Sequence, residues 1–500
     1  MAKPKERRFP TADGGMHFVW NDLSRNDVPL DSKQLRVRLI WDCFSTNSCF
    51  HVHMKHLLVF GGGSAAITGA LRAIEAGWTV ALANNLIPIG GTCLNVGCVP
   101  SKYYIRAAEA LHRAQHGAFP GVNPKGADFD FADLAAGCKA LVTDLRATNY
   151  EDRLPEIEDL RLIEGTAALE AGPNGPVMQV NGEAISGDAA LVATGCYTVV
   201  PPISGLADTP YLTNTSLFDL TELPKSMVVL GAGYIALECA QMMQRFGVDV
   251  TVLQRSSHVL SDQPARIGDA LQAALEADGV RVLTDTDIEH VSYAEDQFRI
   301  RCSHGEIVSD AAFLGLGRAG RTDGLSLTCN AKGYVEVDDY GQTSMPNVYA
   351  AGDVCGDFQF VYAAAYQAEV AIDHLLGRDT PKRAYTSLPW VVFTDPQVAG
   401  VGLDEAEARE AGYDVDVAEQ PVARWPRFRV ACQSEGFLKL IRDRKTDQLL
   451  GARIVCPEAG DLVGEISLAI RHGITVSELS RTLHPYLTLS EGIELAAGKF

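Results

Sequence analysis

Several features are missing from this 500-residue sequence, and each absence excludes a class of protein. No apolar run approaches the roughly 20 residues that cross a bilayer, so we expect no membrane segment. Basic residues are outnumbered, 43 against 63 acidic ones, and the net charge of -20 repels polyanions such as nucleic acids. No secretory signal is visible, which favours a cytoplasmic location. These absences leave small-molecule chemistry as the expected activity.

Paired cysteines are also missing, with one exception. Most of the 12 cysteines are scattered singly, as thiols are in a reducing cytosol. Cys93 and Cys98, however, lie together in GGTCLNVGCVPSK, residues 90–102. A zinc half-site would need a second Cys or His pair at a suitable distance, and none follows, whereas a structural disulfide would suit a secreted chain. The pattern therefore favours a redox-active thiol pair over these two alternatives.

The residues before this pair read as a βαβ unit with a dinucleotide-binding fingerprint. Gly61 allows a tight turn, Gly63 lets the backbone approach a pyrophosphate, and Ala66 keeps helix and strand close. The carboxylate that usually ends the second strand is missing. Asn84 or Asn85 stands there instead, and the predicted ribose ligand, Asn85, can still form a hydrogen bond, although a weaker one than a carboxylate forms.

A second fingerprint, VVLGAGYIALE at residues 228–238, contains Gly231 and Gly233. The strand that follows ends in Gln254 and Arg255 rather than in an acidic residue. This ending suits the 2′-phosphate of NADPH better than the ribose hydroxyl of NADH, so we expect NADPH, with NADH as the alternative. The other interpretation of Arg255 is a solvated surface residue.

Further turns of the nucleotide-binding kind follow both fingerprints. They hold Thr194 and Gly195, then Gly317, and then Asp353 at the end of a strand, where a carboxylate can accept hydrogen bonds from a polyol. We add Gly91, Thr92 and Lys102 of the cysteine segment to these cofactor-binding residues.

Residues 1–53 differ from the rest of the chain because they lack a clean period. They contain thiols and imidazoles that could bind a soft metal ion, namely Cys43, Cys49, His51 and His53. The alternative, which we favour, is a poorly ordered leader or a start codon assigned too far upstream.

These motifs together resemble the pyridine nucleotide-disulfide oxidoreductases of class I, the glutathione reductase and dihydrolipoamide dehydrogenase type. Within that family the chain is most similar to the mercuric reductases. The resemblance covers residues 54–500 and is carried by six strings, at residues 90–102, 231–238, 349–353, 360–362, 391–398 and 485–488.

The resemblance implies an α/β fold with two Rossmann-like dinucleotide-binding domains, for FAD and NAD(P), and a C-terminal α+β dimerisation domain. The expected segments are a leader (1–53), the FAD-binding domain in two parts (54–204 and 326–384), the NAD(P)H-binding domain (205–325) and the dimerisation domain (385–500). It also implies a homodimer whose active site is shared between subunits.

The same resemblance assigns roles to the central residues. Cys98 is expected beside the flavin and Cys93 beside the substrate, while Lys102 pairs with Glu238 near the flavin and Asp353 holds the ribityl chain. The residues themselves agree with part of this assignment. Cys98 begins a helix, whose dipole stabilises a thiolate.

Tyr486 is the most discriminating position. Disulfide reductases of this family have a histidine there, which protonates the departing thiolate. A phenol with a pKa of about 10 is a poor acid for that step. It can, however, orient or coordinate a soft cation held by Cys93 and Cys98. Mercuric reductases resemble this chain there and also at Tyr234, whose phenol is expected from the resemblance to lie across the nicotinamide pocket. The alternative for Tyr486 is packing at a dimer seam.

Two further features bear on this assignment. His484 points to the same side of an extended segment as Tyr486, so it is an alternative base, with Glu491 as the residue that orients it. Mercuric reductases usually continue to a vicinal cysteine pair near the C-terminus, whereas this sequence ends at Phe500 without one and has no N-terminal Cys-x-x-Cys domain. How a metal ion would be delivered is therefore open.

Three functions remain. The leading hypothesis is an FAD- and NADPH-dependent reductase of thiolate-bound Hg(II), with Cys93, Cys98 and Tyr486 as metal ligands. The second is a reductase of a small disulfide or a dihydrolipoamide-type dithiol, with His484 as its base. The third is a non-enzymatic thiol protein that binds soft metals through Cys43, Cys49, Cys93 and Cys98.

Overall fold

The computed structural model describes residues 54–117, 119–124 and 126–500. The expectations for residues 1–53, including the metal-binding interpretation of Cys43, Cys49, His51 and His53, lie outside this range. Across the described ranges, no helix is both long and apolar enough to cross a membrane.

A five-stranded parallel sheet holds the first fingerprint. Strand β1 (His56–Phe60) reads HLLVF and is almost wholly buried, as expected for a parallel strand with neighbours on both sides. The sheet order is β17-β7-β1-β2-β3, and the other strands are β2 (Thr79–Asn84), β3 (Leu160–Glu164), β7 (Ala189–Val192) and β17 (Val348–Ala350). Because β17 comes from far along the chain, the sheet joins the segments predicted as the two parts of the FAD-binding domain, whose boundaries stay predictions.

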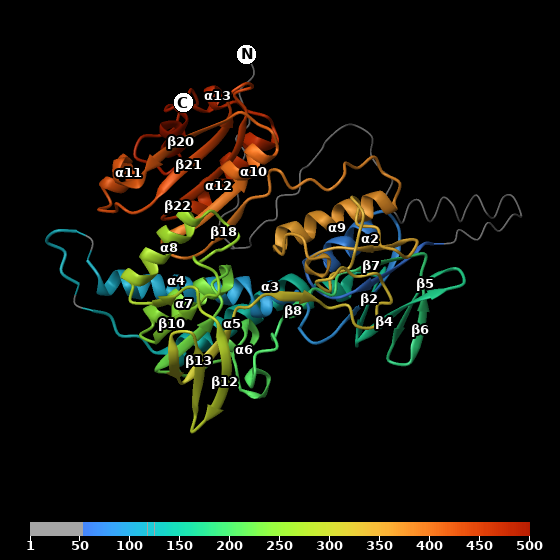
Figure 1. Ribbon diagram of the computed structural model, residues 1–500. Coiled ribbons are helices and arrows are strands. Elements are labelled where there is room, and N and C mark those ends of the chain that lie inside the picture. Colours follow the sequence, from blue (N-terminus) through green and yellow to red (C-terminus); the bar gives the residue numbers. More distant parts are fainter. Residues whose placement is uncertain (1–53, 118, 125) are drawn as a thin grey trace, which may run out of the picture. The chain divides into compact units, whose positions relative to one another are not determined.

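Helices α2 (Ser64–Glu75) and α9 (Val361–Leu375) pack against each other beside this sheet (Figure 1). Ala66 is fully buried in the core that they share with the strands. A larger side chain at this position would separate helix from strand, which agrees with the packing role expected for it.

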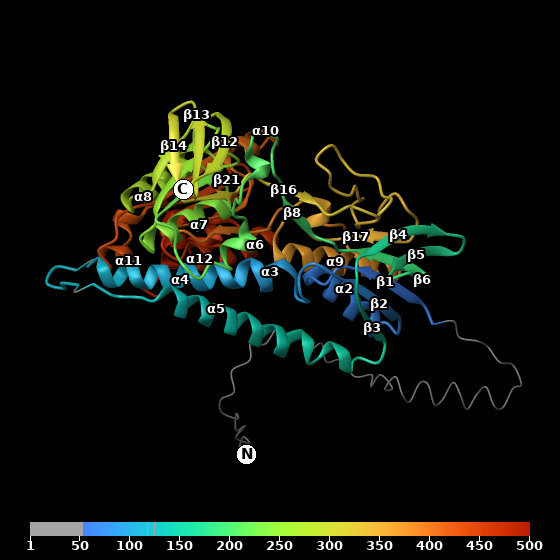
Figure 2. The ribbon, with the colours of Figure 1, turned by 90° about the horizontal axis from the view of Figure 1, so that it is seen from below.

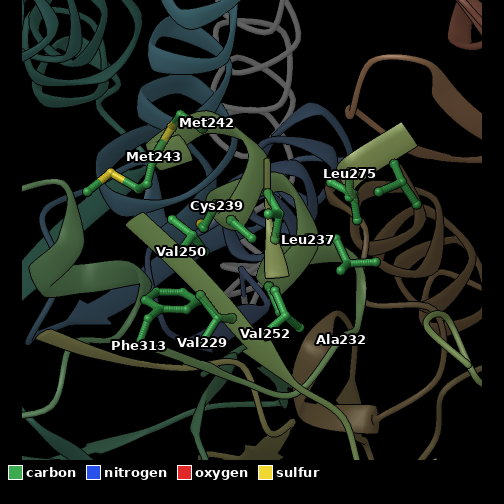
Figure 3. Packing of buried hydrophobic residues seen from close by; sticks show 14 of the residues in the cluster. Val229, Ala232, Leu237, Cys239, Met242, Met243, Val250, Val252, Leu275 and Phe313 are labelled. Atoms are coloured by element: carbon green, nitrogen blue, oxygen red, sulfur yellow. The ribbon is translucent and has the colours of Figure 1, made fainter. Parts of the chain in front are cut away.

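The second fingerprint belongs to a four-stranded parallel sheet in the order β11-β10-β9-β15, formed by β9 (Ser226–Leu230), β10 (Asp249–Leu253), β11 (Arg281–Leu283) and β15 (Ala311–Leu314). Helix α7 (Tyr234–Arg245) covers it, and Figure 3 shows Leu237, Cys239, Met242 and Met243 of the helix among valines of the strands. Helix α8 (Ala265–Ala277) adds Ile267, Leu271 and Leu275 to the same core.

The C-terminal part is an antiparallel sheet in the order β18-β19-β22-β21-β20. Its strands are β18 (Trp390–Val392), β19 (Gln397–Gly402), β20 (Val415–Pro421), β21 (Phe437–Asp443) and β22 (Leu449–Cys456). Helix α12 (Ala459–Arg471) contributes Leu462, Val463 and Ile466 to the core beneath it. Two parallel nucleotide-binding sheets and one α+β part confirm the predicted fold class.

Smaller elements connect these layers. Helices α4 (Cys98–Gln115) and α5 (Phe131–Arg146) lie side by side (Figure 2), and α5 begins where the Asp130 carboxylate accepts hydrogen bonds from the backbone of Ala132 and Asp133. Three short antiparallel sheets complete the fold: β4 (Ala167–Gly172), β5 (Gly175–Val180) and β6 (Glu183–Ser186); β12 (Ile288–Ala294), β13 (Gln297–Cys302) and β14 (Gly305–Ser309); and β8 (Cys196–Thr198) with β16 (Arg318–Gly320).

Candidate active site

The two cysteines of the site lie where one helix ends and the next begins. Helix α3 (Gly91–Val96) carries Cys93, and α4 starts with Cys98. Gly97 joins the helices, and a Cβ atom there would lie 2.8 Å from the Thr92 carbonyl oxygen, so only glycine permits this close turn. Both cysteines are free thiols, and their side chains hydrogen-bond to each other.

This contact separates the acidities of the two thiols. The hydrogen bond from Cys93 lowers the pKa of Cys98 to about 7, with the charge of Lys102 acting in the same direction against burial. The same hydrogen bond, together with burial, raises the pKa of Cys93. Near neutral pH Cys93 therefore stays a thiol, while a large share of Cys98 is thiolate at the start of a helix, as in nucleophilic cysteines.

An ion pair lies one helical turn from Cys98. Lys102 Nζ is 2.6 Å from Glu238 Oε2 of α7, and the other carboxylate oxygen accepts a hydrogen bond of 2.8 Å from the Phe393 backbone. The ammonium group also lies over the Phe393 ring, 4.5 Å from its centroid. The pairing expected from the resemblance is thus present, and it joins α4, α7 and the C-terminal part.

A cavity of about 1430 Å³ connects the dithiol to both fingerprints. This volume exceeds the roughly 300–1,000 Å³ of an ordinary ligand site, so the cavity has room for more than one cofactor. Predicted site residues that line it are Gly63, Thr92, Cys93, Cys98, Lys102, Gly195, Gly233, Tyr234, Glu238, Gly317 and Asp353.

The first fingerprint fits a pyrophosphate. Gly61 has a φ of +117°, and a Cβ there would lie 2.2 Å from the Ala193 carbonyl oxygen. A Cβ on Gly91 would lie 2.6 Å from the Cα of Gly63, so the two glycine backbones approach each other closely. Helix α2 has no side-chain cap in the described structure, which leaves its first N–H groups available to an anion such as the FAD pyrophosphate.

The predicted ribose ligand is less well placed. Asn85 donates to Thr166 Oγ1 and accepts from the Leu86 backbone, and neither it nor Asn84 lines the cavity as described. Asn84 instead lies against the fingerprint turn, since a Cβ on Gly62 would come within 2.6 Å of its side-chain oxygen. Of the two asparagines, Asn84 is therefore the one beside the first fingerprint.

Asp353, another predicted flavin ligand, follows β17 and lines the cavity. Its carboxylate oxygen accepts hydrogen bonds from Arg318 Nη1 at 3.0 Å and from Cys196 Sγ at 3.1 Å. Thr194 Oγ1 donates to the Arg321 carbonyl at 2.6 Å, which fixes the turn before Gly195. This carboxylate retains acceptor capacity toward the cavity, in agreement with a polyol ligand.

The second fingerprint, like the first, leaves space for a dinucleotide beside its glycines. A Cβ on Gly231 would lie 2.6 Å from the Gly315 carbonyl oxygen, whereas a Cβ on Gly233 would meet no described atom within 4 Å. Gln254 is 3.5 Å from the His258 carbonyl oxygen. Arg255 is exposed, and within the part of the chain that the structure describes it forms no ion pair. Its charge is therefore available to a 2′-phosphate.

Tyr234 begins α7 and lies in the same cavity. Its hydroxyl is 3.3 Å from Asp262 Oδ2 and 3.5 Å from Gln263 Nε2. Burial, and then the nearby Asp262 charge, raise the pKa of this phenol, so it stays protonated at neutral pH. Its ring packs on Trp390, with centroids 5.5 Å apart.

The predicted residues of the C-terminal segment do not join this cluster within one chain. The Tyr486 side chain is 73% exposed and does not line the cavity as described. The Glu491 carboxylate accepts a hydrogen bond of 3.0 Å from the Leu487 backbone. Among the residues described, no group of three or more His, Cys, Asp and Glu side chains is arranged to hold a metal ion.

The prediction that Glu491 orients His484 is wrong. The imidazole lies 2.9 Å from Glu465 and 3.4 Å from Glu494, and its side chain is only 5% exposed. Burial is the largest single cause and lowers the pKa of His484, but the hydrogen bond and charge of Glu465, with smaller contributions from Thr482 and Glu494, together raise it above the ordinary value. The sequence did not indicate the contact between His484 and Glu465, because Glu465 belongs to α12 and is 19 residues away along the chain.

Sequence reasoning also missed two aromatic residues that line the cavity, Trp390 and Tyr362. The Tyr362 hydroxyl donates to the Pro389 carbonyl, and burial followed by the charge of Cys98 raises its pKa. Tyr362 lies in, and Trp390 directly before, two of the strings that carry the family resemblance, at residues 360–362 and 391–398. No feature of the sequence indicated that these two strings lie beside the same cavity.

Comparisons with known proteins agree with this geometry. The family model described as pyridine nucleotide-disulphide oxidoreductase matches residues 55–368, and the model of that family's dimerisation domain matches residues 388–497. The chain is 37% identical to a mercuric reductase of Lysinibacillus sphaericus over 89% of this chain and 82% of the relative. It is 36% identical to a mercuric reductase of Streptomyces lividans over 89% of this chain and 96% of the relative.

Two solved structures are similar over nearly their whole length. The HOCl-induced flavoprotein disulfide reductase RclA of Escherichia coli is 30% identical, with a TM-score of 0.79, over 89% of this chain and 99% of that one. LpdA of Mycobacterium tuberculosis is 26% identical, with a TM-score of 0.80, over the same shares of the two chains. These matches confirm the resemblance found in the sequence and, with it, the predicted cofactors FAD and NADPH.

Proposed function

Because the chain belongs to the pyridine nucleotide-disulphide oxidoreductase family, we propose that it is a mercuric reductase that uses FAD and NADPH to reduce thiolate-bound Hg(II) to Hg(0). The observation that carries the proposal is the pair of contacting thiols, Cys93 and Cys98, with separated pKa values in a cavity shared with both fingerprints. The chemistry that FAD supplies when bound is the transfer of the two electrons of a hydride to sulfur.

The side chains of the site suit a soft metal ion. Hg(II) prefers thiolates, and two sulfurs can give it linear coordination. The thiolate of Cys98 is available near neutral pH, and Lys102 stabilises its negative charge. In balance, Hg(II) gains two electrons and becomes Hg(0), while NADPH loses a hydride and becomes NADP⁺.

Tyr486 supports a metal substrate over a disulfide. We infer a homodimer in which Tyr486 of one chain faces the dithiol of the other, because the dimerisation domain presents this phenol at 73% exposure and the neighbouring Leu483 at 94%. A phenol can orient a metal bound by two thiolates, whereas it is a poor proton donor to a leaving thiolate near neutral pH.

The test is NADPH oxidation by the purified flavoprotein with Hg(II), Cu(II), lipoamide or glutathione disulfide as acceptor. We expect Hg(II) at micromolar concentration to support turnover and Cys93→Ala to abolish it. Tyr486→Phe should reduce turnover with Hg(II) and leave the flavin content unchanged. Turnover of a disulfide without any metal-dependent oxidation would overturn the metal proposal.

The second candidate is reduction of a small disulfide, and the similarity to RclA, a protein named as a disulfide reductase, favours keeping it. His484 would be its base, with a pKa raised by Glu465. Its buried imidazole, however, is held by two carboxylates, which leaves it little freedom to reach a substrate. A pH–rate profile separates the two, because His484→Ala removes a limb near neutral pH only if this histidine is the base.

The third candidate is a thiol protein that binds metals without catalysis, and the flavin content of the purified protein distinguishes it from an enzyme. The two fingerprints and the large cavity support an enzyme, which should be purified yellow with bound flavin. A colourless protein that binds Hg(II) would favour sequestration instead.

A further inference from the structure

The backbone on both sides of the exposed Tyr486 is held in place. After it, Leu487 has a φ of +63°, a left-handed conformation that a leucine adopts only where its surroundings impose it. Thr488 Oγ1 donates to the Pro485 carbonyl oxygen at 2.7 Å, and the Thr488 carbonyl oxygen accepts a hydrogen bond of 3.3 Å from the Trp425 indole. The phenol therefore projects from a segment with little freedom of its own.

Before Tyr486, the contacts of His484 hold the segment. The imidazole Nε2 is 2.9 Å from Glu465 Oε1 of α12, and its side chain is only 5% exposed. On the opposite side of the ring, Nδ1 is 2.9 Å from the Thr482 carbonyl oxygen and 3.4 Å from Glu494 Oε2 of α14 (Glu491–Ala497). The imidazole thus joins the segment to two helices at once.

These neighbours match the charged form of the histidine. Two carboxylates and a carbonyl group are hydrogen-bond acceptors, and they face both ring nitrogens. A neutral imidazole has only one N–H, so its other nitrogen would face acceptors with a lone pair. The imidazolium donates from both nitrogens and satisfies both sides.

Other carboxylates of the adjoining elements have different partners. Glu478 of α13 (Val476–Leu479) accepts a hydrogen bond of 2.8 Å from the Thr475 backbone, and Glu491 of α14 accepts one from the Leu487 backbone. The charged groups that face the imidazole are therefore Glu465 and Glu494.

We propose that the His484 imidazolium is a positioning residue for Tyr486, because its bonds to α12 and α14 set the direction in which the phenol projects. Only Pro485 separates the two residues. The proline ring fixes its own φ and restricts the backbone of His484, so a movement of the imidazole is passed on to Tyr486. The consequence for turnover rests on the proposed function, which places Tyr486 at the dithiol of the partner subunit.

A residue that acts through Tyr486 should lose its effect when the phenol is removed. His484→Gln loses the charge and one of the two opposed donors, and we expect it to lower kcat with Hg(II) by about 2- to 10-fold, as for coupled residues of one hydrogen-bond network. The loss should not exceed that of Tyr486→Phe. In the double variant, His484→Gln should add almost nothing to the effect of Tyr486→Phe. Flavin content and the rate of flavin reduction by NADPH are the controls for folding.

The second readout does not depend on activity. NMR of the FAD-loaded protein with 13C-labelled histidine and tyrosine rings follows both side chains, with the signals assigned by their loss in His484→Gln and Tyr486→Phe. In the wild type, the Tyr486 signal should shift with pH at the midpoint of the His484 titration. Glu494→Gln removes a charge that favours the imidazolium, so both midpoints should move to lower pH. The matched control Asp461→Asn, at an exposed carboxylate in the first turn of α12, should leave both midpoints in place.

The outcomes separate the inference from the function. An equal fold-loss from His484→Gln with and without Tyr486→Phe overturns the inference, since the effect would not pass through the phenol. A Tyr486 signal that ignores the His484 titration also overturns it. Two signals that titrate together in a protein without Hg(II) turnover support the positioning of Tyr486 by His484 and overturn the proposed function alone.

Discussion

Replacement of Lys102 by methionine should slow the reaction of Cys98 with a thiol-alkylating reagent. The lysine charge favours the Cys98 thiolate, and with the hydrogen bond from Cys93 it holds the pKa at about 7 rather than at the ordinary 9.0. Methionine has a similar length and no charge, so it removes the electrostatic contribution and leaves the Cys93 hydrogen bond in place. The pKa should therefore rise, but by less than the whole difference.

The size of the effect follows from the titration curve. With a pKa of about 7, about half of Cys98 is thiolate at about pH 7. If the pKa rises by about one unit, the thiolate fraction falls to about one tenth, and alkylation slows about 5-fold. Far above the new pKa, both proteins are fully ionised and the rates converge. The midpoint of the rate profile should move to higher pH.

The assay is the rate of iodoacetamide addition to Cys98 in the reduced flavoprotein, followed by peptide mass spectrometry across a range of pH values. Glu238→Gln is the matched control with the opposite sign, because the Glu238 charge raises the pKa of Cys98. This variant should alkylate faster than the wild type below about pH 7. Identical pH profiles in the wild type and Lys102→Met would refute the argument that Lys102 controls this thiolate.

Three further predictions concern the cofactor sites and the C-terminal part. Gly91→Ala should yield protein with little bound FAD, measured as flavin absorbance per chain, because its Cβ would lie 2.6 Å from the Cα of Gly63 at a φ of +66°. Arg255→Ala should raise the KM for NADPH about tenfold or more and leave that for NADH unchanged, since a charge-assisted hydrogen bond to phosphate is lost; equal effects on both would contradict the 2′-phosphate assignment. Glu465→Gln should lower the free energy of unfolding, measured by urea denaturation, more at about pH 5 than at about pH 9. The reason is that the pKa of His484 is raised in the folded state, so its stabilisation is complete below the pKa of the unfolded state and is lost as the pH rises through the pKa of the folded state. An equal loss at both pH values would show that His484 is not the titrating group.

Most of the catalytic centre could be predicted from the sequence because its chemistry is local. Cys93 and Cys98 are close in sequence, and the turn at Gly97 brings their side chains together without help from distant residues. Gly61, Gly63 and Ala66 likewise act within one βαβ unit, where strand, turn and helix follow in order. The pairing of Lys102 with Glu238 was available only through the family resemblance, because the two residues are 136 positions apart.

The one wrong prediction of a partner has the opposite cause. His484 was assigned to Glu491 because both belong to the same segment, whereas its partners depend on how α12 and α14 (Glu491–Ala497) pack around it. The choice of Asn85 over Asn84 as the ribose ligand stays a prediction, because adjacent residues of a strand end face opposite ways and the sequence alone does not show which one faces the fingerprint. Both questions depend on the direction of a side chain, which tertiary packing sets.

The contact between Trp390 and Tyr234 illustrates the same limit at a larger scale. The sequence does not predict that Trp390, Gly400 and Arg453 are neighbours, because only the register of three antiparallel strands brings them together. A register shift of one residue would move Trp390 to the other face of the sheet and release Tyr234. The register is held by the apolar side chains that alternate with this row, among them Ala399, Val401 and Ile454, which are fully buried. The packing that stabilises the C-terminal sheet therefore also sets the position of an aromatic ring in the nucleotide-binding cavity.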